Sequence, residues 1–177
     1  MFKKMALVAL LSLAVPGLAL ADEGFLVGGG LGATHGESGD RTFGNFSDTA
    51  TGWKGFAGYE FNYWALEVAY VDLGNLKDDG LSVEGDAITY SVLGLIPYTD
   101  RMDITLKLGY FDAEYDFRIL GVSGDTDGEG IVLGAGLRYS FSDHFLVRGE
   151  FDWFEDDNSA GDLEKVWYLG AAIEFKF

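Results

Sequence analysis

The sequence predicts an all-β protein, an eight-stranded antiparallel up-and-down transmembrane β-barrel that is preceded by a cleaved signal peptide. Three observations predict this fold class. The N-terminus has the layout of an export signal, the remainder is rich in glycine and aromatic residues without any cysteine, and segments of about ten residues alternate apolar with polar or small side chains.

Residues 1–21 have the three parts of a secretory signal. Two lysines precede an uncharged apolar run, Pro16-Gly17 interrupts that run, and Ala19-Leu20-Ala21 supplies the small residues of a cleavage site. A retained membrane helix is the alternative, but the apolar run is too short to span about 30 Å of hydrocarbon. We therefore expect cleavage after this signal and one barrel domain over residues 22–177.

The mature chain is strongly acidic. Loss of the two signal lysines leaves 10 basic and 29 acidic residues, a net charge of −19. This excludes nucleic acid as a partner, because phosphate contacts need clusters of Lys and Arg that the sequence lacks. Without cysteine there are no disulfides, and with Pro97 as the one remaining proline the composition favours strands.

Eight alternating segments are separated by turn residues, and they cover residues 24–34, 52–62, 64–73, 87–99, 102–117, 130–142, 145–155 and 165–177. The first is blurred by Gly28, Gly30 and Gly32 on its polar face, and the fourth by Leu93 and Leu95. The second and third alternate cleanly. Their apolar faces consist of Trp53, Gly55, Ala57, Tyr59 and Phe61, and of Trp64, Leu66, Val68 and Tyr70.

The last four segments alternate over longer stretches. In the fifth, sixth and seventh, the residues on the apolar face are Ile104, Leu106, Leu108 and Tyr110; Ile131, Leu133, Ala135, Leu137, Tyr139 and Phe141; and Phe145, Val147, Gly149, Phe151 and Trp153. The eighth has an unbroken apolar stripe, made of Trp167, Leu169, Ala171, Ile173, Phe175 and Phe177. Such stripes indicate strands with one face in apolar surroundings.

The opposite faces carry charged residues, namely Lys54, Glu60, Glu67, Lys107, Arg138, Arg148, Glu150, Asp152 and Glu174. Two kinds of barrel fit this pattern. In a soluble barrel of the lipocalin type, the charges face water and the apolar face lines a ligand cavity. In a membrane barrel, the apolar face meets lipid and the charges pair inside a narrow lumen.

Three features favour the membrane barrel. Aromatic residues on one strand lie eight positions apart, as in Trp53 and Phe61, which corresponds to roughly 20 Å along the membrane normal. Short and long connections alternate, with tight turns at 62–63, 100–101 and 143–144 and long loops at 37–51, 74–86, 118–129 and 156–164. The chain also ends on the apolar stripe, at Phe177. Short turns and both termini are then expected on the periplasmic side.

Two stretches carry a resemblance to a known family. They are Leu66-Glu-Val-Ala-Tyr70-Val-Asp-Leu-Gly74 and the C-terminal run from Tyr168 to Phe177. With the eight-segment layout, they resemble the small, porin-family-like outer-membrane β-barrel proteins of Gram-negative bacteria, which include the OmpA-like transmembrane domain and OmpX-type barrels. The resemblance implies an outer-membrane location among lipid and lipopolysaccharide. It also implies an assembly signal at Tyr168, Phe175 and Phe177 that the barrel-assembly machinery reads.

The four basic and five acidic residues of the predicted lumen nearly balance. Because the interior of an eight-stranded barrel is just wide enough for side chains, we favour a paired, filled lumen over a conducting path. The glycines of the first segment would leave room for longer neighbours. A narrow, porin-like channel for small solutes is the alternative.

Most of the negative charge, −15 of −19, lies in or beside the predicted long loops. Divalent cations near lipopolysaccharide are candidate partners for these loops, and ordinary solvated loops are the simpler explanation. Asp125-Thr126-Asp127-Gly128-Glu129 resembles part of a calcium loop but lacks the later ligands and the bidentate Glu of an EF-hand. We expect no metal site and no cofactor.

Catalysis needs a nucleophile, a base and an orienting group. Some barrels of this class modify lipid A with Ser and His, and here His35 has Ser38 and Ser47 nearby while His144 lies in a predicted turn. Since any polar loop contains such residues, we expect no catalytic set. The leading hypothesis is a non-enzymatic structural or interaction barrel, followed by a small-solute channel and then a lipid A-modifying enzyme.

Overall fold

A computed structural model describes residues 23–38, 46–78, 81–119, 122–156 and 165–177. They form eight strands: β1 (Glu23–Ser38), β2 (Phe46–Phe61), β3 (Trp64–Asp78), β4 (Leu81–Thr99), β5 (Met102–Ile119), β6 (Val122–Ser140), β7 (Phe145–Asp156) and β8 (Lys165–Lys176). Within this described part, no helix is long and apolar enough to cross a membrane. The predicted signal peptide, residues 1–21, lies outside it.

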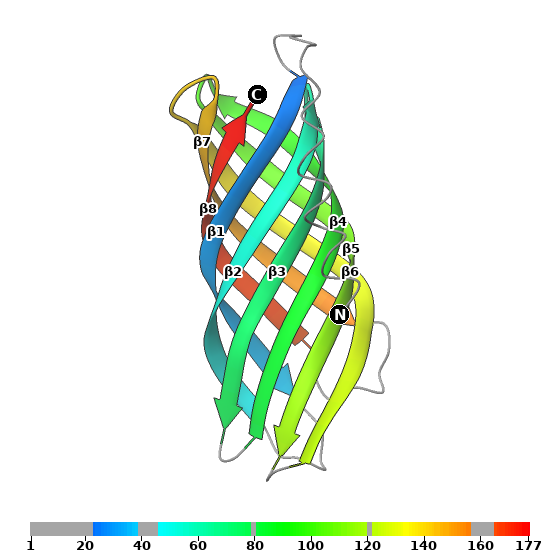
Figure 1. Ribbon diagram of the computed structural model, residues 1–177. Helices are drawn as coiled ribbons and strands as arrows, with labels where there is room; N and C mark the ends of the chain where they lie inside the picture. Colours follow the sequence, from blue (N-terminus) through cyan, green and yellow to red (C-terminus); the bar gives the residue numbers. More distant parts are fainter. Residues whose placement is uncertain (1–22, 39–45, 79–80, 120–121, 157–164) are drawn as a thin grey trace.

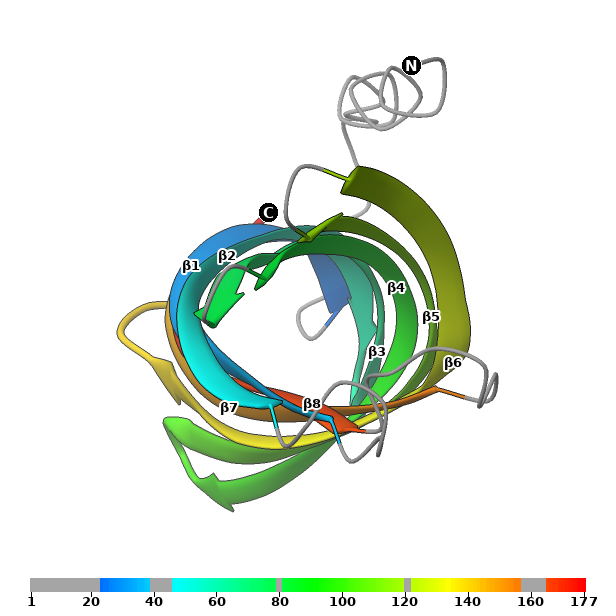
Figure 2. The ribbon, with the colours of Figure 1, turned by 90° about the horizontal axis from the view of Figure 1, so that it is seen from below.

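The predicted architecture is confirmed. The strands pair antiparallel in chain order, and β1 pairs with β8 to close the barrel (Figures 1 and 2). A path that starts at Leu26 and follows paired residues through all eight strands returns to β1 at Gly36, ten residues beyond its start, which is a shear number of 10. This stagger tilts the strands and leaves an interior wide enough only for side chains.

Three turns lie at one end of the barrel, here called the short-turn end, together with the C-terminus (Figure 1). The β2–β3 turn is Asn62-Tyr63, and Asn62 has a φ of 45°, which asparagine tolerates better than most residues. The β6–β7 turn spans residues 141–144 instead of the predicted 143–144. It is longer because the amides of Phe141 and Ser142 both bond to the carbonyl of Phe145.

The strands extend past their predicted bounds at the opposite end, here called the long-strand end. The predicted loops 74–86 and 118–129 are mostly strand, since β3 and β5 continue to Asp78 and Ile119. In the same way β2 takes up residues 46–51 of the predicted loop 37–51. Past the membrane the outward side chains of β4, β5 and β6 become acidic, so the apolar alternation ends while backbone pairing continues. The ends of β3 to β6 reach farthest in Figure 1.

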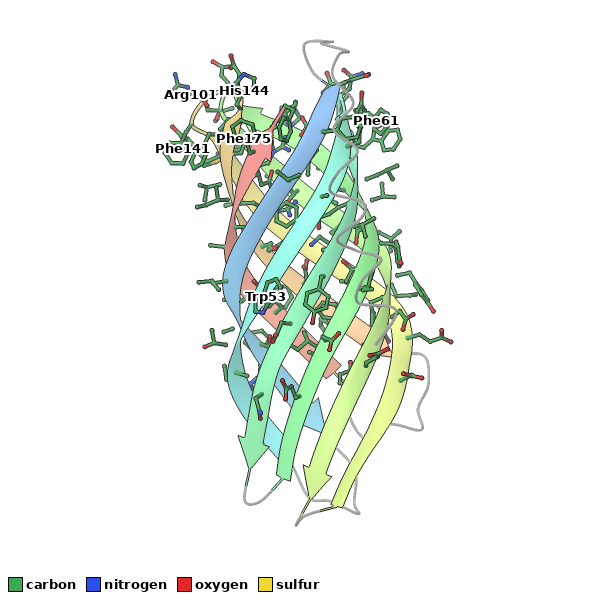
Figure 3. The ribbon with its side chains drawn as sticks, in the orientation of Figure 1. Trp53, Phe61, Arg101, Phe141, His144 and Phe175 are labelled. Atoms are coloured by element: carbon green, nitrogen blue, oxygen red, sulfur yellow. The ribbon has the colours of Figure 1, made fainter. Side chains whose placement is uncertain are left out.

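Apolar side chains cover the outside of the barrel. Leu31 is 67% exposed and Leu108 59%, whereas charged side chains are buried within. Aromatic residues form two belts on this surface. One lies at the short-turn end and contains Phe61, Phe141 and Phe175, and the other includes Trp53 (Figure 3). The second belt also includes Tyr70, which lies against Trp53, and the register pairs Tyr90 with Tyr110 and Trp153 with Trp167. An apolar exterior with aromatic belts is the membrane arrangement, and it excludes the soluble lipocalin-type alternative.

Candidate functional site

All nine charged residues that the sequence places on the polar faces point into the barrel. They are buried: Lys54, Glu60, Glu67, Lys107, Arg138, Arg148, Glu150, Asp152 and Glu174. Asp103 on β5 and Lys176 on β8 join them in ion pairs at the short-turn end. These eleven residues are called the ionic layer below. Sequence reasoning missed the last two, although Asp103 alternates in step with Lys107 and Lys176 with Glu174.

The centre of the ionic layer crosses the lumen. The Lys54 ammonium donates to both carboxylate oxygens of Glu150 at 2.7 Å. Lys107 donates to Asp152 at 2.7 Å and to Glu150 at 3.0 Å. Arg148 donates from Nη2 to Glu67 at 2.6 Å. These charge-assisted bonds link strands that are not neighbours in the sheet.

A second group of ion pairs lies at the short-turn end. Arg138 donates to Glu60 at 2.6 Å and to Asp103 at 2.9 and 3.1 Å. Lys176 donates to the other oxygen of Glu60 at 2.8 Å. Its side chain is 17% exposed and that of Asp103 19%, against 7% or less in the rest of the ionic layer. Water therefore reaches this layer from the short-turn end.

Glycines on the inner face of β1 make room for two aromatic rings. A Cβ atom on Gly28 would collide with the ring of Phe56, and one on Gly32 with the ring of Tyr168. The guanidinium carbon of Arg148 lies 4.6 Å from the centroid of the Phe56 ring, a cation–π distance. The glycines thus leave the space that the longer neighbours fill.

An apolar layer lies in the lumen on the long-strand side of the ionic layer. It consists of Val71, Phe111, Val132, Phe154 and Tyr168, each 3% exposed or less. On β3, β5 and β7 these residues follow Glu67, Lys107 and Asp152 in the direction of the long-strand end. The rings of Phe111 and Phe154 meet edge to face at 5.4 Å. Sequence reasoning missed this layer, because inward apolar residues look like breaks in a polar face.

Carboxylates line the outside of the wall just past the second aromatic belt. Strand register places Asp86 opposite Glu114, Glu114 opposite Asp127, and Asp112 opposite Glu129. We call these five residues, with Asp72, the acidic rim. Two belt residues bond to it, since Trp53 Nε1 donates to Asp72 at 3.0 Å and the Tyr110 hydroxyl donates to Glu129 at 2.5 Å. Asp86, Asp127 and Glu129 thus lie on strands where loops were predicted, whereas the other three rim residues fall in predicted strands.

Residues 125–129, which resemble part of a calcium loop in sequence, do not form one. These residues belong to β6 and pair with β5, and successive side chains of a strand point to opposite sides of the wall. A calcium loop must instead curl its ligands around one point. Over the part of the chain that the structure describes, no group of three or more His, Cys, Asp or Glu could hold a metal ion.

The two histidines lie at opposite ends of the barrel. His35 Nδ1 is 3.0 Å from the Thr49 hydroxyl, and its ring lies 5.0 Å from that of Trp167. The side chains of Ser38 and Ser47, its predicted neighbours, are outside the described residues. His144 lies in the β6–β7 turn, with Nδ1 2.9 Å from the Lys176 carbonyl (Figure 3).

The residues of the predicted assembly signal do not share a face. Phe175 and Phe177 point outward and are 44% and 66% exposed, while Tyr168 is buried in the lumen. The Phe177 amide donates to the Phe25 carbonyl at 2.9 Å and so holds the chain end to β1. Recognition of these residues by the assembly machinery stays a prediction.

Comparisons with known proteins agree with this geometry. The family model for the outer membrane protein beta-barrel domain matches residues 5–175. Neisserial surface protein A superposes with a TM-score of 0.73, at 16% identity over 86% of this chain and 97% of that one. The N-terminal β-barrel domain of Pseudomonas aeruginosa OprF superposes with a TM-score of 0.66, at 16% identity over 88% of this chain and 99% of that one. OprG of the same organism superposes with a TM-score of 0.61, at 14% identity over 88% of this chain and 96% of that one.

Identities this low support the fold alone, and comparison with curated proteins found no match. The family model nevertheless spans almost the whole chain, and every described strand takes its place in the closed barrel. The chain therefore belongs to the outer-membrane protein β-barrel domain family and is a protein of the bacterial outer membrane.

Proposed function

We propose that this protein is a non-enzymatic barrel with a closed lumen, which acts through its outer surface instead of transporting solutes. The filled interior carries this proposal. The ionic layer crosses the lumen, and the apolar layer lies over it toward the long-strand end. A conducting path would need both layers to open at once.

Single-channel recording tests the closed lumen. The refolded barrel, inserted into a planar lipid bilayer, is expected to show no discrete conductance steps. The double variant Phe111→Ala with Phe154→Ala lacks the pair of rings in the apolar layer. Its conductance is recorded for comparison with the same amount of protein in the bilayer. Steady, reproducible steps from the unmodified barrel would instead establish the small-solute channel.

Lipid analysis tests the absence of catalysis. Mass spectra of lipid A from cells with and without the protein should be identical, because the Nδ1 atom of His35 lies beside the Thr49 hydroxyl and not beside a serine. A new lipid A mass that disappears with His35→Ala would show that the barrel is an enzyme.

We also propose that the acidic rim attracts divalent cations where the wall leaves the membrane. By the usual orientation of these barrels, the long-strand end faces the outside. Like charges directly opposite each other destabilise a sheet, and the rim has three such pairs in register across β4, β5 and β6. Calcium or magnesium that also contacts lipid phosphate would relieve this repulsion. The partner is a diffuse layer of cations, not an ion in a coordination cage.

Thermal unfolding in detergent tests the cation proposal. Millimolar calcium should raise the unfolding midpoint more than sodium chloride of equal ionic strength, since ligands of the folded state stabilise it. Glu114→Gln, in the middle of the rim, should reduce the calcium effect. Glu23→Gln, at the short-turn end, is the matched control and should leave it unchanged. Equal shifts with calcium and sodium would mean simple screening.

A further inference from the structure

The ionic layer contains one more acid than base. Among the described residues that face this part of the lumen, the bases are Lys54, Lys107, Arg138, Arg148 and Lys176, and the acids are Glu60, Glu67, Asp103, Glu150, Asp152 and Glu174. A buried carboxylate without a compensating charge is costly, and in practice such a group becomes neutral. One of the six acids is therefore expected to differ from the rest.

Glu174 is the acid that differs. Each of the other five accepts at least one hydrogen bond from a basic side chain. Glu174 is 1% exposed, and neither of its carboxylate oxygens has a hydrogen-bond partner. Arg148 Nε lies 2.9 Å from Oε1 but is also without a hydrogen bond, so it does not point at that oxygen.

The groups around Glu174 cannot supply a full counter-charge. Arg148 on β7 donates to Glu67 on β3, and Arg138 on β6 donates to Glu60 and Asp103 while its Nη1 stays 4.0 Å from Glu174. The register partners of Glu174 are Gly28 on β1 and Leu146 on β7, which add no polar side-chain group. Glu67 and Glu150, the acids across the lumen, share Arg148 with it.

We propose that Glu174 is a proton-binding site and is the neutral carboxyl group of the ionic layer at neutral pH. A proton fits better than a metal ion, because no metal-holding group of acids exists in the described residues. The proton would enter from the short-turn end, where Asp103 and Lys176 are partly exposed, and the apolar layer blocks the other side. The protonation of Glu174 is separate from the proposed function and holds whether or not the barrel conducts.

Infrared spectroscopy of the refolded barrel at neutral pH tests the site. A protonated carboxylic acid has a carbonyl stretching band apart from that of carboxylates, and the band shifts in heavy water. We expect this band in the unmodified protein, its loss in Glu174→Gln, and its retention in the control Glu23→Gln.

Stability provides a second measurement. Glutamine has the shape of a protonated glutamate, so Glu174→Gln should refold and keep the urea midpoint of the unmodified barrel. Glu67→Gln, at an equally buried position, removes the negative charge that accepts the Arg148 bond and should lower that midpoint. The proposal is overturned by the absence of the band from the unmodified protein, by its persistence in Glu174→Gln, or by a Glu174→Gln barrel that unfolds as readily as Glu67→Gln.

Discussion

At the scale of single residues, the lumen is filled by matching large side chains to glycines. Phe56 lies against Gly28, and Tyr168 lies against both Gly32 and Gly170. Glycines in a strand interior usually weaken it, and they are found where another group approaches closely. Here the close approach comes from rings of neighbouring strands, so the glycines of β1 serve packing.

This predicts a difference between two glycine substitutions. Gly28→Ala puts a methyl group into the Phe56 ring and the Ile173 carbonyl, and overpacking of this kind costs about 1–3 kcal/mol of the free energy of unfolding. Gly149→Ala is the matched control, because a Cβ atom there meets nothing within 4 Å. Urea unfolding followed by tryptophan fluorescence measures both. Equal stability of the two variants would mean that the rings move aside freely.

At the scale of elements, the longer strands have two parts with different surroundings. The part between the aromatic belts alternates lipid-facing and lumen-facing residues, while in the outer part of β4, β5 and β6 acidic outward side chains alternate with buried inward residues. A bulge in β3 marks the change. There Gly74 has a φ of 78° and its amide donates to Asp72 at 2.7 Å, and Asp72 also holds the belt residue Trp53.

Hydrogen exchange should reveal these two parts. Strand β6 pairs with β5 from Val122 onward, but within the described residues its pairing with β7 begins only at Gly130. Residues 122–129 of β6 therefore have β5 as their one described neighbouring strand. Amides of this stretch are expected to exchange faster than those of residues 131–139, because they border water and lack a second neighbouring strand. Mass spectrometry of peptides from the detergent-refolded barrel can compare them. Equal protection would show that another segment covers this edge.

At the scale of the whole molecule, the barrel is held by continuous pairing without a free edge between the belts. In lipid every backbone group must be paired, and closure satisfies this condition. The refolded protein should therefore resist SDS at room temperature and change its gel mobility after boiling. An unchanged band, from protein that is monomeric without detergent, would argue against a closed membrane barrel.

The sequence predicted what lies between the aromatic belts and little of what lies outside them. Alternation of Lys107 with Leu106 and Leu108 was enough to separate lumen from lipid, because a one-residue shift would put a charge into hydrocarbon. The same alternation could not show that Asp127 and Glu129 belong to β6, because the outward face is acidic instead of apolar in this part of the wall. It also could not pair Lys54 with Glu150, because partners across a lumen depend on the register of every strand between them.

The ion pairs of the ionic layer join opposite sides of the wall. Lys54–Glu150 links β2 to β7, Arg148–Glu67 links β7 to β3, and Arg138–Glu60 links β6 to β2. In mechanical terms these ion pairs are braces across the barrel. A cylinder without braces flattens under a sideways load, but a braced one keeps its round cross-section. When the membrane thickens or its lateral pressure changes, this barrel will keep its cross-section and the spacing of its aromatic belts, and the surrounding lipids will be the part that deforms.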